Sequence, residues 1–96
     1  MQMKDLTAWV ISRQVVIVNE LGLHARSAAG IAKLAVNAGK GVWIAKREET
    51  ADARDILDIL TLACPKGTKI TIGIDDTSDE EILNRIVSLV ESGFGE

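Results

Sequence analysis

Hydrophobic and polar positions alternate with two different periods along the chain, and the changes of period mark the first elements. The β-branched run 15–18, bounded by Asn19 and Gly22, predicts a strand. Apolar residues then recur at helical spacing over 25–38, which predicts a helix that ends at Gly39. The apolar face of this helix consists of Ala28, Ile31, Ala32 and Ala35. Because most of these residues are alanines, we expect the helix to lie close to the element that it covers.

The middle of the chain predicts two short strands and a short helix. Residues 42–46 and, with a weaker pattern, 49–53 have the composition of strands. The dipeptide 47–48 between them is not a favoured two-residue hairpin turn, so the sequence defines this boundary poorly. Residues 55–62 predict a short amphipathic helix, with Asp55 as its N-cap.

The last third predicts a turn, a strand and a second long helix. A turn at 64–67 is followed by strict alternation over 68–74, which places Ile70, Ile72 and Ile74 on one face. Ser78 followed by Glu81 is the pattern of a capping box and predicts the start of a final helix that ends at Gly93. Its apolar stripe is Ile82, Leu83, Ile86, Val87 and Val90. The order of strands and helices predicts an α+β fold, with the helices on one face of the sheet.

The uncovered face of that sheet is predicted to be unusually apolar. Val16, Val18 and Trp43 should point toward it. Gly73 and Thr71 are small enough for Trp43 to lie across them.

Residues 1–12 are predicted to extend the N-terminus of a domain that spans 13–96. This extension carries Leu6 and Trp9. We expect it to fold over the apolar sheet face or to mediate self-association.

Composition and charge exclude several classes of function. The 96 residues suit one compact domain. A net charge of −3 and only three aromatic residues argue against nucleic-acid binding, which needs a basic surface or a stacking platform. No apolar run approaches the roughly 20 residues of a membrane helix, and no signal-peptide pattern is present. With Cys64 as the only cysteine, no internal disulfide or ordinary structural zinc site is expected. We therefore expect a cytoplasmic protein without metal or cofactor.

The only histidine, His24, stands where the first predicted strand has ended and the first helix begins. A helix N-terminus presents unpaired N–H groups and about half a unit of positive charge, which together attract an anion. The same field disfavours imidazolium and favours the neutral, nucleophilic ring. Arg26 is close enough to neutralise a phosphoryl group carried by His24. From spacing alone, an incidental surface histidine is the stronger interpretation of His24.

The segment 22–26, Gly-Leu-His-Ala-Arg, resembles the active-site segment of the histidine-containing phosphocarrier protein (HPr) family of the phosphotransferase system. Segment 55–62 resembles the short second helix of that family, and the dipeptide 66–67 before an alternating strand fits the same order. The ending 92–96 is similar to tails of its proteobacterial and nitrogen-related branches. The likeness covers roughly residues 13–96. It implies an HPr-like open-faced sandwich, with a four-stranded antiparallel sheet covered on one face by three helices.

The resemblance implies a phosphocarrier and not an enzyme. A phosphoryl group derived from phosphoenolpyruvate would pass from enzyme I to Nδ1 of His24. It would then pass to an enzyme IIA-type domain in sugar uptake or its regulation. Arg26 would stabilise the phosphate, without a metal. Partners would dock on Ala25, Ser27, Lys33, Ile56, Leu57 and Leu60.

Four positions depart from the family pattern. Ser27 stands where many members have proline, which the first turn of a helix tolerates but does not require. Val36 and Asp58 replace residues that are often basic, which would weaken recognition by an acidic enzyme I surface. Asp55 occupies the position of the regulatory serine and cannot be phosphorylated. Its carboxylate is either a helix cap alone or a partial imitation of the phosphorylated state.

Two other functions stay open from the sequence. One is a small regulatory or ligand-sensing α+β module in which the histidine is incidental. The other is a nitrogen-branch regulatory phosphocarrier that acts mainly by binding other proteins. Uptake of a phosphoryl group from phosphoenolpyruvate through enzyme I separates the phosphocarrier from the first of these.

Overall fold

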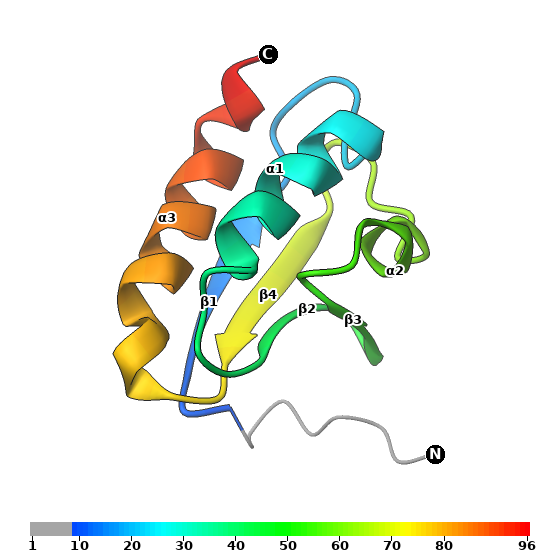
Figure 1. Ribbon diagram of the computed structural model, residues 1–96. Coiled ribbons are helices and arrows are strands. Elements are labelled where there is room, and N and C mark those ends of the chain that lie inside the picture. Colours follow the sequence, from blue (N-terminus) through cyan, green and yellow to red (C-terminus); the bar gives the residue numbers. More distant parts are fainter. Residues whose placement is uncertain (1–8) are drawn as a thin grey trace.

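The computed structural model describes residues 9–96, which form one sheet with helices on one side of it (Figure 1). The elements in chain order are β1 (Ile11–Val16), α1 (Ala25–Ala35), β2 (Val42–Lys46), β3 (Glu49–Asp52), α2 (Ile56–Leu60), β4 (Lys69–Ile74), the 3₁₀ turn η2 (Thr77–Asp79), α3 (Glu80–Glu91) and the 3₁₀ turn η3 (Gly93–Gly95). All pairings are antiparallel, in the order β1-β4-β2-β3. The α+β open-faced sandwich expected from the sequence is confirmed.

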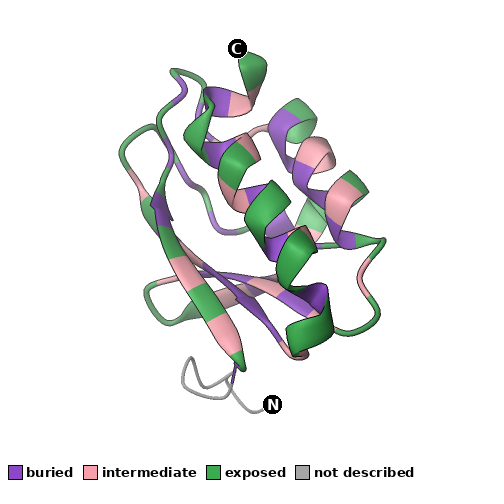
Figure 2. Cartoon of the chain, turned by 90° about the vertical axis from the view of Figure 1, so that its left-hand side faces the viewer, coloured by how far each residue is buried: buried purple, intermediate pink, exposed green. Residues whose placement is uncertain are grey.

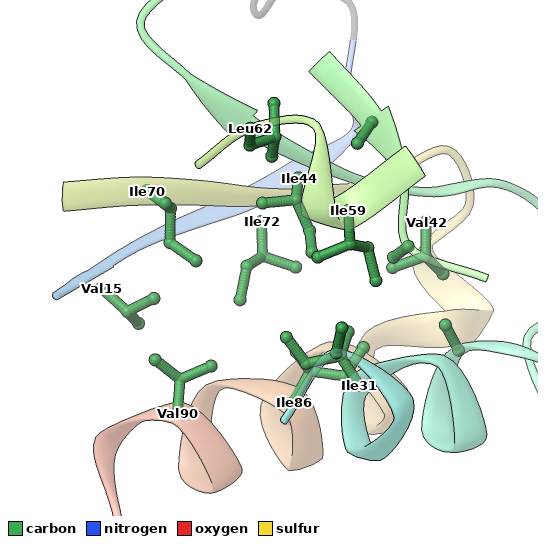
Figure 3. Close-up of a cluster of buried hydrophobic side chains, with 14 of the residues drawn as sticks. Val15, Ile31, Val42, Ile44, Ile59, Leu62, Ile70, Ile72, Ile86 and Val90 are labelled. Atoms are coloured by element: carbon green, nitrogen blue, oxygen red, sulfur yellow. The ribbon is translucent and has the colours of Figure 1, made fainter. Parts of the chain in front are cut away.

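The core lies between the sheet and the helices, where the buried residues gather in Figure 2. Ile72 of the central strand β4 pairs with Arg13 of β1 and Ile44 of β2. In Figure 3 the inward side chains of the sheet, Val15, Val42, Ile44, Ile70 and Ile72, face Ile31 of α1 and Ile86 and Val90 of α3. Burying each such side chain contributes roughly 1.5–3 kcal/mol. The alternation over 68–74 was therefore a reliable guide to the buried face.

The alanine-rich face of α1 is buried as predicted, and α1 packs against α3. A Cβ added at Gly30 would lie 3.3 Å from Leu89 of α3, so little room separates the two helices. Small residues thus let α1 approach its neighbours closely, and this close packing fixes the start of α1 relative to the sheet.

Several element ends differ from the prediction. β1 is Ile11–Val16 and not 15–18, because the polar residues at its start obscure the alternation. The N–H groups of Asn37 and Ala38 bond to carbonyls three residues back, at 3.2 and 3.1 Å, so α1 ends at Ala35 and not at 38. β3 and α2 are each shorter than expected, at Glu49–Asp52 and Ile56–Leu60.

The predicted capping box of Ser78 and Glu81 is wrong. Ser78 lies inside η2, whose cap is Asp76, and Asp76 accepts the Ser78 N–H at 2.8 Å. α3 begins after Asp79, which is buried and turns its carboxylate away from its own helix. That carboxylate accepts the backbone N–H groups of residues 39–40 at 2.9 and 3.0 Å. Asp76 therefore performs the capping that the pattern assigned to Ser78.

The open face of the sheet is covered by Trp9 and not by Trp43. A Cβ at Gly73 would overlap the Trp9 indole, which is buried on this face. Trp43 instead donates its Nε1–H to Asp75 at 2.9 Å, so the expectation that it crosses Gly73 is wrong. The N–H of Val10 bonds to the carbonyl of Ile74 at 3.0 Å, which brings the chain before β1 past Gly73.

Other expectations for this face are met only in part. Val16 and Val18 are exposed, as predicted. Trp9 covers the face as expected of the N-terminal segment, whereas Leu6 lies outside the described residues. The last two residues of the segment 1–12 belong to β1.

Gly93 follows the C-cap Ser92 of α3 with φ +72° and ends this helix as predicted.

Candidate functional site

His24 occupies the N-cap position of α1, with an extended backbone at φ −129°. The turn before it depends on Gly22, whose φ is +67° and whose missing Cβ leaves room for the backbone of Cys64 and Pro65. The N–H of Leu23 bonds to the Cys64 carbonyl at 2.8 Å. The segment that carries His24 is therefore fixed by a distant part of the chain.

The buried side chain of Ser27 stabilises the first turn of α1 through its hydrogen bonds. Its side chain is only 1% exposed, and its Oγ accepts the His24 N–H at 2.9 Å. The hydroxyl is also within donor distance of the carbonyls of Gly22 and His24, at 3.2 and 3.1 Å. The His24 ring faces the Ser27 N–H in a capping-box arrangement, of which only the Ser27 half is a hydrogen bond. Ser27 was expected to contact partners, but the structure turns its side chain inward.

Three backbone N–H groups at the start of α1 precede its hydrogen-bond ladder. The first bond of that ladder runs from the Ala28 N–H to the His24 carbonyl at 2.8 Å. The N–H groups of residues 25–27 therefore lie at the positive end of the helix dipole. Arg26 is exposed and lines the same shallow hollow as His24, together with Glu20, Leu21, Ala25 and Glu96. This arrangement can hold an anion beside the imidazole ring.

Glu96, to which the sequence analysis assigned no role in the site, closes one side of the hollow. Its Oε2 is 2.5 Å from Nε2 of His24, and its Oε1 accepts the Nδ2–H of Asn19 at 2.9 Å. Asn19 is buried and also donates to the Gly22 carbonyl at 2.8 Å. The hydrogen bonds from Asn19 and His24, in that order, hold the pKa of the Glu96 carboxyl below its ordinary value. His24 and Glu96 are 72 positions apart in the sequence, so only the fold reveals their contact.

The expected docking residues fall into an exposed and a buried set. Leu57 of α2 is 76% exposed and Ile56 is 38% exposed, whereas Leu60 packs partly against the core. Ala25 and Lys33 are exposed on α1, which packs beside α2. The structure therefore brings an apolar surface of α2 next to the exposed side of α1. We call Ile56, Leu57 and Leu60 the α2 surface.

Helix α2 is held at both ends although it has only five residues. The carboxylate of Asp55 accepts the Asp58 N–H at 3.2 Å, which confirms the predicted N-cap. Beyond the C-cap Thr61, Nζ of Lys46 donates to the carbonyls of Leu62 and Ala63 at 2.9 and 2.8 Å and so holds the turn that follows the helix. A cation at the end of a helix also favours its dipole.

Groups suited to a metal ion are absent from residues 9–96, where no cluster of three or more histidine, cysteine, aspartate or glutamate side chains occurs. Over the same residues, none of the helices has the length and apolar character needed to cross a membrane.

Comparison with known proteins identifies the family to which this fold belongs. The family model for the PTS HPr component phosphorylation site matches residues 11–92. The phosphocarrier protein HPr of Cupriavidus necator is 31% identical over 91% of this chain and 98% of its own. The phosphocarrier protein NPr of Shewanella violacea is 36% identical over 90% of this chain and 94% of its own.

The solved structures show the same similarity in three dimensions. The crystal structure of HPr from Thermoanaerobacter tengcongensis matches with a TM-score of 0.85 and 30% identity. That match covers 91% of this chain and 98% of the other. An open-faced sandwich with a histidine at the start of its first helix defines the class of histidine phosphocarriers. The chain belongs to the HPr family of the phosphotransferase system, whose members are carriers phosphorylated on histidine and not enzymes.

Proposed function

We propose that His24 accepts a phosphoryl group from enzyme I, which phosphoenolpyruvate has charged, and passes it to an enzyme IIA-type domain. One observation carries this proposal: the only histidine of the sequence caps a helix at whose positive end Ala25 and Arg26 line the same hollow as the histidine ring. A carrier of this family needs one histidine, and this chain offers one.

The local charges suit the anion that transfer creates. A phosphoryl group on the ring brings nearly two negative charges and three acceptor oxygens. The N–H groups of residues 25–27 and the guanidinium of Arg26 supply donors from a rigid backbone and from a mobile side chain. Within residues 9–96, the Arg26 guanidinium forms no ion pair that would have to break first. Transfer thus replaces part of the water around the phosphate by hydrogen-bond donors of the protein.

The α2 surface is the proposed dock for both partners. Leu57 is the most exposed large hydrophobic residue in the described part of the chain, and solvent-exposed apolar clusters commonly mark protein interfaces. Ala25 and Lys33 of α1 would border the same contact. The inward-facing Ser27 would support it by shaping the helix start.

A phosphotransfer assay tests the proposal directly. The protein is incubated with enzyme I and labelled phosphoenolpyruvate, and the product is treated with acid and with alkali. Phosphohistidine is labile in acid and stable in alkali, so the label should be lost only in acid. The variant His24→Ala should fold and take up no label, because truncation removes the nucleophile and little packing. Uptake by this variant, or none by the wild type, would leave a binding module with an incidental histidine.

The relatives belong to both the HPr and the NPr group, so the assay should include both kinds of partner. Labelled protein is mixed in turn with IIA domains of the sugar and of the nitrogen branch. The domain that removes the label fastest identifies the acceptor, and hence whether transfer serves sugar uptake or regulation.

A further inference from the structure

We propose that Glu96, held by Asn19, is a positioning residue that fixes the His24 ring with its proton on Nε2 and leaves Nδ1 as the attacking nitrogen. This inference rests on the proposed function of His24 and adds a mechanism to it. Its basis is a hydrogen-bonded chain from the Gly22 carbonyl through Asn19 and Glu96 to the ring.

The first step in the argument concerns which ring nitrogen is available. Nε2 lies 2.5 Å from a carboxylate oxygen of Glu96, so a phosphorus atom cannot approach it. A carboxylate only accepts hydrogen bonds, and the ring nitrogen that faces it must therefore carry the proton. In the neutral ring the other nitrogen then holds the lone pair, which makes Nδ1 the nucleophile.

The second step concerns what keeps the Glu96 carboxylate in place. The buried Asn19 lies in the turn before α1, and its Nδ2 donates both to Glu96 and to the Gly22 carbonyl. Turning the amide over would present its oxygen to two acceptors, so this orientation is the one that satisfies them. Its Oδ1 has no partner within the described chain, which shows that the donors of Asn19 determine its placement. The carboxylate is thus anchored to the loop that carries His24 and not only to its own segment.

The third step concerns charge during transfer. The lone pair of Nδ1 forms a bond to phosphorus while the bond between phosphorus and the donor's ring nitrogen breaks. The proton on Nε2 stays in place, so the His24 ring becomes a phosphorylated imidazolium with a positive charge. The carboxylate of Glu96 faces the edge of the ring where that charge is shared, and it stabilises the charge as it forms. Return of the phosphoryl group to an acceptor passes through the same charged ring, so both directions benefit.

The Coulombic setting of Glu96 is consistent with this role. Arg26 is near enough to lower the pKa of the Glu96 carboxyl, after the larger effects of Asn19 and His24. A guanidinium within Coulombic range of Glu96 can also pair with the phosphoryl group on His24.

The decisive experiment reads the tautomer of His24 by NMR. Because the chain has a single histidine, labelling with ¹⁵N-histidine gives two ring signals without assignment. At about pH 8.5, where imidazole is neutral, the wild type should show Nε2 protonated and Nδ1 unprotonated. In Glu96→Ala both signals should move toward the values of a mixture of tautomers. Unchanged ring signals in Glu96→Ala would overturn the proposal, whatever the phosphotransfer assay shows.

A kinetic experiment isolates the charge of Glu96. Glu96→Gln keeps an oxygen that can accept a hydrogen bond but removes the charge. Its phosphorylation rate should fall by roughly 10- to 100-fold, the range of one charge-assisted hydrogen bond. The matched control is Glu91→Gln, an equal change of charge at an exposed residue of α3, which should transfer at the wild-type rate. Equal rates for Glu96→Gln and Glu91→Gln would refute the role of Glu96, whereas absence of label in the wild type would refute the function of His24.

Discussion

Replacing Arg26 by alanine should slow phosphoryl transfer without abolishing it. The N–H groups of residues 25–27 precede the first ladder bond of α1 and remain as donors in the variant. The lost interaction is one charge-assisted hydrogen bond to the phosphate, worth about 1.5–3 kcal/mol. If Arg26 acts only in the transition state, this loss corresponds to a rate reduced roughly 10- to 150-fold.

Rapid quenching of the reaction with labelled enzyme I measures this rate under single-turnover conditions. The control variant Arg85→Ala removes the same charge from α3, where Arg85 is exposed and pairs with Glu81 at 3.6 Å. Arg26→Lys should recover part of the rate, since it restores the charge but not the two-pronged geometry of guanidinium. A rate for Arg26→Ala equal to that of Arg85→Ala would show that Arg26 does not meet the phosphate.

Three further predictions concern regulation, stability and pH. A serine kinase cannot modify position 55, and Asp55→Ser should keep the helix cap yet bind enzyme I more tightly at low salt if the aspartate imitates a phosphoserine. Titration calorimetry over a salt series checks this, and equal affinities would leave Asp55 as a cap alone. Asp79→Ala leaves the N–H groups of residues 39–40 without their acceptor and should cost about 2–4 kcal/mol in urea unfolding. Its control Glu80→Ala, which breaks an exposed ion pair, should cost less than about 1 kcal/mol. Because the pKa of Glu96 is lowered on folding, its contacts are complete above the ordinary value of 4.5 and weaken as the pH falls below it. The carboxyl ¹³C signal of Glu96 should titrate below that value, and a midpoint at or above it would contradict the contact with Asn19.

Much of the fold was predictable because its signals are local. The alternation that buries Ile72 and the alanine-rich face of α1 each follow from neighbouring residues. The cap at Asp55 was equally visible, since the residue and the N–H that it accepts are three positions apart. The capping box at Ser78 failed by the same logic, because Asp76 offered a competing carboxylate two residues earlier.

The remaining features depend on contacts between distant segments. The residue that covers the open sheet face could not be predicted without knowing that β1 pairs with β4. That pairing places Trp9 and not Trp43 over Gly73. The residues of the site likewise divide into those with a local sequence signal and those brought in by distant contacts. His24 carries a recognisable motif, whereas Glu96 joins it only through the packing of the whole chain.

The two-ended support of α2 has a consequence for how the protein associates with others. An isolated helix of five residues would be unfolded in water. Here Asp55 and Lys46 hold both of its ends, so the exposed Leu57 is presented on an ordered backbone before any partner arrives. Binding through such a preorganised surface loses little conformational entropy, and a small contact area is then enough for a specific complex. If the α2 surface is the dock proposed above, such a contact would also dissociate quickly and would let one carrier molecule visit its donor and its acceptor in rapid succession.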